Sequence, residues 1–178
     1  LATKDVDEIV ETVVRIAPGF GGINLEDIAA PRCFEVEAKL TERLDIPVFH
    51  DDQHGTAIVL LAALINALKI VDKKIGDIKV VISGAGSAGS AIGNLIMRYG
   101  ARNVIFCDRN GILNKDTAIN DAQLKLCEIT NLGNLHGTIA DALKGTDVFI
   151  GVSAPGIVTP DMINTMNHDA IAFPMANP

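Results

Sequence analysis

KVVISGAGSAG, residues 79–89, decides the fold of this chain. The apolar run at residues 80–82 is typical of a strand buried on both faces. It leads into the spacing G-x-G-x-x-G at residues 84–89 and then into apolar residues at helical spacing up to Tyr99. A strand, a glycine turn and a helix in this order are typical of a dinucleotide-binding fold.

Each glycine of the turn has its own physical role. Gly84 permits the tight change from strand to helix, Gly86 lets the backbone approach a pyrophosphate, and Gly89 lets the helix pack on the strand. The helix N-terminus then offers free N–H groups and the positive end of its dipole. We therefore expect the phosphates to bind along the turn formed by Gly84, Ala85, Gly86, Ser87, Ala88 and Gly89.

A second expected strand, residues 103–107, ends beside a carboxylate. Asp108 follows Gly84 by 24 residues, near the spacing expected for the acid that accepts hydrogen bonds from the adenosine ribose. An acid here favours NAD because it repels the 2′-phosphate of NADP, whereas Arg109 could bind that phosphate. We therefore prefer NAD as the cofactor and keep NADP open. The alternative to a nucleotide site is that residues 84–89 are only a glycine-rich turn and Asp108 is a solvated acid in a loop.

Composition limits the function. The chain has 178 residues, 48% of them hydrophobic, and a net charge of −7 without a basic stripe, so we expect no nucleic-acid partner. The longest apolar run, Ala57–Ile65, is short for a membrane span, so we expect no membrane partner. The odd number of cysteines, Cys33, Cys107 and Cys127, argues against a disulfide framework. A reducing compartment fits best, and we expect a cytoplasmic protein, with an organelle matrix as the alternative.

The alternation of apolar strands and helices predicts an α/β fold with a Rossmann-type, doubly wound parallel sheet. Expected helices cover residues 5–17, 31–44, 56–71, 121–130 and 139–143, and expected strands cover 46–49, 80–82, 103–107, 147–151 and 170–175. Helix 56–71 is apolar almost all round, so we expect it to be buried. The sheet has fewer strands than the usual six or so and the chain lacks an initiator Met, so we expect a piece of a longer polypeptide.

Polar residues gather where the expected strands end. Ligands of parallel sheets bind at the carboxyl ends of the strands. Ser153 and Asn177 follow two of these strands, and we expect both to contact the nucleotide. The cluster at residues 50–56, HDDQHGT, follows strand 46–49, and we place a domain boundary there, with residues 1–50 and 51–178 on its two sides.

Carboxylates outside the nucleotide turn indicate a cation site. Glu26, Asp27 and Asp52, with Asp51 beside the last, would repel one another unless a cation lay between them. Mg²⁺ or Mn²⁺ prefers such oxygen ligands. The alternative is that these acids only stabilise helix starts. His50 and His54 are better explained as hydrogen-bonding residues than as metal ligands.

Five segments resemble the small bacterial-type malic enzymes, and the resemblance covers essentially the whole chain. They are GGINLEDIAAP (21–31), PVFHDDQHGTA (47–57), SGAGSAG (83–89), GVSAPG (151–156) and the closing Phe173 with Ala176, Asn177 and Pro178. The resemblance implies oxidative decarboxylation of malate to pyruvate and CO₂, with NAD or NADP reduced, a divalent metal bound and a homodimer or larger oligomer.

The resemblance also assigns roles. It implies that Glu26, Asp27 and Asp52 hold the metal, that Asp51 lies at the catalytic centre, and that Asn177 contacts substrate as well as cofactor. Residues 1–50 would then end a smaller α/β substrate domain, and residues 51–178 would form a truncated nucleotide domain.

One departure from the family pattern is serious. The Tyr and Lys that serve the family as acid and base, and a substrate-binding Arg, lie upstream of this piece, and Tyr99 is not that Tyr. A second substrate-contacting Asn lies downstream. Residues 1–178 alone are therefore expected to be inactive.

Two other functions stay open. One is a two-domain NAD-dependent dehydrogenase acting on amino acids or folate one-carbon units, which would need no acidic metal set. The other is a non-catalytic NAD-binding module, which measured turnover would exclude.

Overall fold

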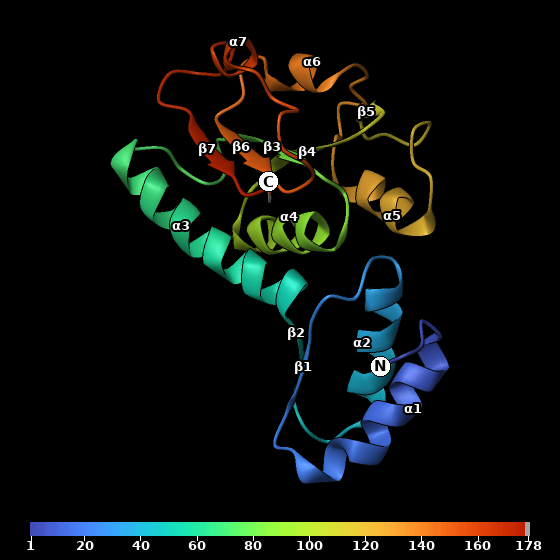
Figure 1. Ribbon diagram of the computed structural model, residues 1–178. Helices are drawn as coiled ribbons and strands as arrows, with labels where there is room; N and C mark the ends of the chain where they lie inside the picture. The colour runs from blue at the N-terminus through green and yellow to red at the C-terminus, as the bar shows by residue number, and fades with distance from the viewer. Residues whose placement is uncertain (177–178) are drawn as a thin grey trace.

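The computed structural model describes residues 1–176 and places them in two parts joined by one long helix (Figure 1). The N-terminal part contains α1 (Val6–Ile16), the 3₁₀ turn η1 (Ala17–Gly19), β1 (Ile23–Leu25), α2 (Arg32–Arg43) and β2 (Val48–His50). Strands β1 and β2 pair in parallel, with Leu25 opposite His50. Apolar residues of both helices and of β1 form a separate small core.

The second part is built on a five-stranded sheet with the order β5-β4-β3-β6-β7. Its strands are β3 (Lys79–Ser83), β4 (Asn103–Asp108), β5 (Gly111–Ile112), β6 (Val148–Gly151) and β7 (Ile171–Pro174). Four strands are parallel, as the sequence predicts, but β5 pairs antiparallel with β4. Strand β5 is not among the expected strands, because a two-residue strand is too short to leave a periodic pattern.

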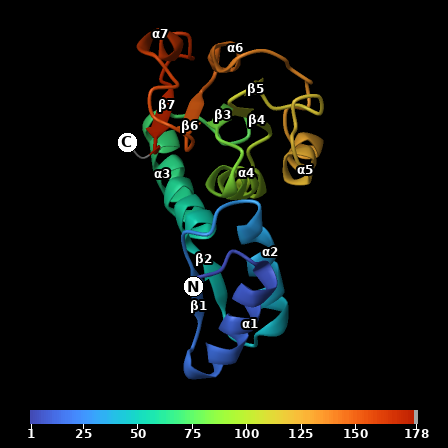
Figure 2. The same cartoon turned by 45° about the vertical axis from the view of Figure 1, so that its right-hand side comes forward.

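Helices cover both faces of this sheet (Figures 1 and 2). On one side lie α3 (Thr56–Ile70), α4 (Ser87–Tyr99) and α5 (Asp121–Ile129), and on the other lie α6 (Ile139–Leu143) and α7 (Pro160–Ile163). The pleat divides the core accordingly: Val80 and Ile82 face the α3–α4 side, while Val81 faces α6. The observed layers are those of a doubly wound α/β fold.

Most expected elements lie within a few residues of their observed bounds. Asp5 caps α1 as expected, because its Oδ1 accepts the N–H of Glu8 at 2.9 Å. The helix expected over residues 31–44 is α2, and the one expected over 139–143 is α6.

The expectation that helix 56–71 is buried all round is wrong. Helix α3 buries one stripe, made of Ala57, Leu60, Leu64 and Leu68. Ile58, Val59 and Ile70 are 54%, 65% and 85% exposed on its other side. A uniformly apolar helix has no polar face to show which side the core takes, so its sequence cannot reveal partial exposure.

The length and composition of the continuous helical stretch Asp51–Ile70 would suffice to cross a membrane. Core helices meet the same criterion, and α3 packs against α4 and contributes to the main core.

Asp147 fastens the amino end of the sheet. One carboxylate oxygen accepts from Lys73 Nζ at 2.8 Å and from Asn167 Nδ2 at 3.0 Å, and the other accepts the N–H of Lys79 at 2.8 Å. Burial acts to raise the pKa of Asp147, but these donors outweigh it and hold the pKa below its usual value of 3.8. Asp147 therefore ties β3, β6 and two loops together.

We predict that Asp147→Asn destabilises the fold by about 2 kcal/mol at pH 7, because it removes a charged acceptor and leaves buried donors poorly paired. A carboxyl group whose pKa is lower in the folded than in the unfolded protein stabilises the fold when the pH lies above the unfolded-state pKa. This contribution is lost as pH falls through the folded-state pKa. The gap between the thermal melts of wild type and variant should therefore stay constant above about pH 4 and narrow only as pH falls below 3.8. The exposed Asp161→Asn is the control, and a constant gap at every pH would contradict the assignment.

Candidate functional site

The glycine turn leaves β3 through a left-handed residue. Gly84 has φ +123°, and its N–H donates to the carbonyl of Cys107 at 2.8 Å. A Cβ on Gly84 would lie 3.2 Å from the backbone of Val152, which follows β6. The turn therefore lies at the carboxyl end of β3, between the neighbouring strands β4 and β6. Doubly wound sheets bind ligands at such a position.

The other two glycines differ sharply in the space around them. A Cβ on Gly89 would lie 1.8 Å from the carbonyl oxygen of Gly84, so only glycine lets α4 begin this close to the turn. A Cβ on Gly86 would have no heavy atom within 4 Å. Gly89 thus serves the fold, whereas the space beside Gly86 is open to a ligand. The predicted structural roles of Gly84 and Gly89 are thus observed, and the approach of a pyrophosphate to Gly86 stays a prediction.

A groove of about 400 Å³ opens beside this turn. Its lining brings together turn residues, the acid after β4 and a segment of the N-terminal part, namely Ala30, Pro31, Phe34, Gly84, Ala85, Gly86, Asp108, Arg109, Ile119, Asn120, Ala122, Gln123, Val152 and Ser153. Eight of these residues were not among the predicted site residues, because they come from loops and helices that the glycine motif does not include. The groove therefore joins the two parts of the chain.

Asp108 is held in position at the mouth of this groove. Its Oδ1 accepts the N–H of Asn110 at 2.7 Å, and its Oδ2 accepts from Gln123 Nε2 at 3.4 Å. Gln123 is buried and its Oε1 accepts the N–H of Ile119 at 2.8 Å. Sequence reasoning missed Gln123, because a glutamine on the first turn of α5 gives no signal by itself.

The residue before Asp108 is chemically inert. Burial raises the pKa of Cys107 to about 12, with the Asp108 carboxylate adding to the effect. The thiol therefore stays neutral, and nothing favours a nucleophilic role for it.

Ser153 lies across from β3. Its Oγ and the Oγ of Ser83 are 3.0 Å apart, and both residues also line a second hollow of about 230 Å³ beside β7. Asn177, expected to contact cofactor and substrate, lies outside the described residues.

The acids after β2 sit in a π-helical turn. We call residues Asp51–Gly55 the acidic turn; it connects β2 to α3 without a side-chain cap. Asp52 Oδ2 instead accepts the N–H of Asp27 at 2.9 Å, and Asp27 has a left-handed φ of 58°. Helix capping therefore does not account for Asp52. Asp51 is exposed and close to Gly55, where a Cβ would lie 2.4 Å from its Oδ1.

The predicted metal ligands are only partly brought together. Asp27 and Asp52 are in contact, but Glu26 and Asp27 line a hollow of about 320 Å³ with Arg32. Within residues 1–176, His, Cys, Asp and Glu side chains nowhere form a group of three that could hold a metal. The donor chemistry fits a hard cation, since all these groups are carboxylates at the ends of two paired strands.

The two histidines of this segment differ in environment. His50 is fully buried, and in the described part of the chain neither ring nitrogen has a hydrogen-bond partner. Its Nδ1 lies 3.9 Å from Asp52 Oδ2. His54 pairs with Glu37 and packs against the ring of Phe49, with centroids 5.6 Å apart.

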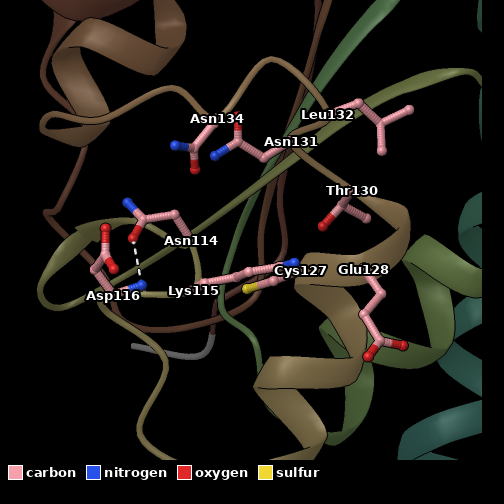
Figure 3. Close-up of a pocket in the computed structure, with 9 residues that line it drawn as sticks. All are labelled: Asn114, Lys115, Asp116, Cys127, Glu128, Thr130, Asn131, Leu132 and Asn134. Atoms are coloured by element: carbon pink, nitrogen blue, oxygen red, sulfur yellow. Dashed lines mark hydrogen bonds between the residues drawn. The ribbon is translucent and has the colours of Figure 1, made fainter.

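A further hollow of about 430 Å³ lies between α5 and the loop that follows β5 (Figure 3). Its lining includes Asn114, whose side-chain amide bonds to Ile112 and Asp116 of its own loop. It also includes Asn131, whose Nδ2 donates to the carbonyl of Leu113 and whose Oδ1 accepts the N–H of Leu135. None of the predicted site residues lines it.

Known proteins match both parts of the chain. Residues 53–178 match the family described as "Malic enzyme, NAD binding domain", and residues 2–41 match "Malic enzyme, N-terminal domain". An NAD-dependent malic enzyme of Geobacillus stearothermophilus is 57% identical across 100% of this chain and 37% of that protein. An NADP-dependent malic enzyme of Escherichia coli (strain K12) is 43% identical across 98% of this chain and 23% of that protein.

Solved structures agree. The crystal structure of an NAD-dependent malic enzyme from Thermotoga maritima has a TM-score of 0.97 and 45% identity, covering 100% of this chain and 48% of that one. The chain thus spans less than half the length of each of these relatives.

We predict that Gly86→Val abolishes NAD binding without destabilising the fold, because the new side chain enters the open groove and meets no protein atom. The expected result in calorimetry is loss of detectable NAD binding with an unchanged melting temperature. Gly89→Ala is the contrasting variant: unlike Gly86→Val, it should lower the melting temperature, since its Cβ meets the Gly84 carbonyl. Wild-type NAD affinity in Gly86→Val would contradict the placement of the pyrophosphate.

Proposed function

Since this chain belongs to the malic enzyme family, we propose that the protein oxidatively decarboxylates malate to pyruvate and CO₂ while NAD or NADP is reduced. One observation carries the proposal: the groove beside the glycine turn is also lined by Ala30, Pro31 and Phe34 of the N-terminal part. These residues lie within eight positions of Glu26 in sequence. A nucleotide and a substrate held by the acids would therefore lie next to each other.

The nucleotide would be bound by the residues that line the groove. Backbone N–H groups at the start of α4 would face the pyrophosphate beside Gly86. The carboxylate of Asp108, oriented by Asn110 and Gln123, would accept hydrogen bonds from the adenosine ribose. Ser153, which follows β6, also lines the groove.

We propose NAD as the preferred nucleotide. Asp108 carries its negative charge where a 2′-phosphate of NADP would lie, and the repulsion disfavours that cofactor. Arg109 lines the same groove and is the residue that would favour NADP, and relatives of both kinds match this chain.

The acids would hold Mg²⁺ or Mn²⁺ through Glu26, Asp27 and Asp52. When bound, such a cation supplies Lewis-acid polarisation of the oxygens of a 2-hydroxy acid. The contact between Asp52 and the N–H of Asp27 keeps the ends of β1 and β2 together and so keeps these carboxylates near one another. Asp51, exposed on the same turn, would lie beside the substrate.

The reaction also needs proton transfer. Removing the hydroxyl proton of malate needs a base, and protonating the enol of pyruvate needs an acid. The family resemblance places a Tyr and a Lys for these roles outside residues 1–178. We further propose a cytoplasmic homo-oligomer.

Family membership argues against the other dehydrogenase classes, and metal dependence is the observable that separates them. An amino-acid or folate dehydrogenase would not need the acids of residues 26, 27 and 52. A non-catalytic nucleotide-binding module would bind NAD and turn over no malate.

We predict that Asp52→Asn weakens Mn²⁺ binding by at least the 10–100-fold typical of losing an outer-shell partner of a metal site. Asparagine keeps an oxygen that can accept the N–H of Asp27, so the loss should come from the missing charge. Calorimetric Mn²⁺ titration of the full-length protein is the measurement, with the exposed Asp45→Asn as control. Equal Mn²⁺ affinity in wild type and Asp52→Asn would refute the ligand assignment.

A further inference from the structure

Glu37 is the residue of α2 that reaches the acidic turn. One carboxylate oxygen accepts from Gln53 Nε2 at 3.0 Å, and the other pairs with His54 Nε2. The Glu37 side chain is only 18% exposed, and Gln53 is 4% exposed, so water competes weakly for these bonds. Two successive residues of the turn are thus fixed by a single carboxylate from another element.

The acidic turn is tight enough to transmit this constraint to the acids. The N–H of Thr56 donates to the carbonyls of Asp51 and Gln53, closing the turn. The carboxylate of Asp51 lies against Gly55, so a shift of the turn moves Asp51 with it. A shift would also break the bond between Asp52 and the N–H of Asp27.

The same region contacts the nucleotide half. The acidic turn packs on α4, whose first residues form the glycine turn. A hollow of about 340 Å³ between α2, the acidic turn and α4 is lined by Gln53 and His54, the partners of Glu37, and by Ser90 and Asn94 of α4. Figure 2 shows α2 reaching towards α4 at this point.

We propose that Glu37 is a positioning residue: its paired contacts with Gln53 and His54 hold the acidic turn so that Asp51 and Asp52 face the substrate. This proposal rests on the proposed function. Glu37 would act through the acidic turn, without contacting Asp51 or Asp52 itself. The alternative is that Glu37 only joins two elements and adds stability.

The test compares Glu37→Ala, Glu37→Gln and Glu35→Ala in the full-length protein. Glu35 is the matched control, since it lies on the same helix but is 55% exposed and pairs with Lys39. Glutamine can still accept from Gln53 with its oxygen and donate to His54 with its amide, so it should restore the positioning. The readouts are Mn²⁺ affinity by calorimetry, kcat and KM for malate, NAD affinity and melting temperature.

We expect Glu37→Ala to weaken Mn²⁺ binding roughly 10–100-fold and to lower kcat, with NAD affinity unchanged because the glycine turn keeps its own support. Glu37→Gln should recover most of the loss, and Glu35→Ala should match wild type. If Glu37→Ala fails to fold, Gln53→Ala removes one of the same bonds from the other side and should give the same weakened Mn²⁺ binding.

Wild-type Mn²⁺ affinity and kcat in Glu37→Ala, with only a lower melting temperature, would overturn the proposal. A Glu37→Gln variant as impaired as Glu37→Ala would also overturn it, because the hydrogen bonds would then not be what matters. The proposed function is judged on the wild-type protein: if wild type binds Mn²⁺ and oxidises malate, either of these variant results overturns only the role of Glu37. A wild-type protein that does neither would overturn the proposed function and this inference together.

Discussion

The approach of α4 to the end of β3 is the constraint on which the rest of the nucleotide half depends. Gly89 lies so close to the Gly84 carbonyl that no side chain fits between them, and Gly93, one turn later, lies against the ring of Phe106 on β4. A Cβ at Gly93 would be 2.4 Å from that ring. This contact seats the helix on the sheet, so its N-terminus ends beside the open space at Gly86.

The second half of the site is positioned by hydrogen bonds between elements. Asp27 and Asp52 join the ends of β1 and β2, while Glu37 joins α2 to the acidic turn. The acidic turn continues into α3, which packs on α4, so the two halves share one continuous helical support. The groove that Phe34 and Gly86 both line follows from this arrangement. In the proposed function it would place a nucleotide next to the acids.

Sequence reasoning captured what periodicity and local motifs encode. The glycine spacing and the buried strands predicted the sheet, the turn and the place of Asp108, and all of these are observed. It missed β5, the exposed side of α3, and the supports given by Gln123 and Glu37. A two-residue strand is too short to leave a periodic pattern, and a uniformly apolar helix does not show which side is exposed. The supports given by Gln123 and Glu37 depend on partners elsewhere in the fold, such as Gln53 for Glu37, and a single polar residue on a helix does not reveal its partner.

Comparing the full-length protein with residues 1–178 tests the account most directly. The measurement is malate-dependent NADH formation with Mn²⁺, together with the pyruvate and CO₂ released, alongside NAD binding by each form. We predict that the full-length protein is active, and that residues 1–178 bind NAD but turn over at least about 10²–10⁴-fold more slowly, since general acid–base help is missing. Comparable rates in the two forms would contradict the account, because the acid and base would then lie within residues 1–178.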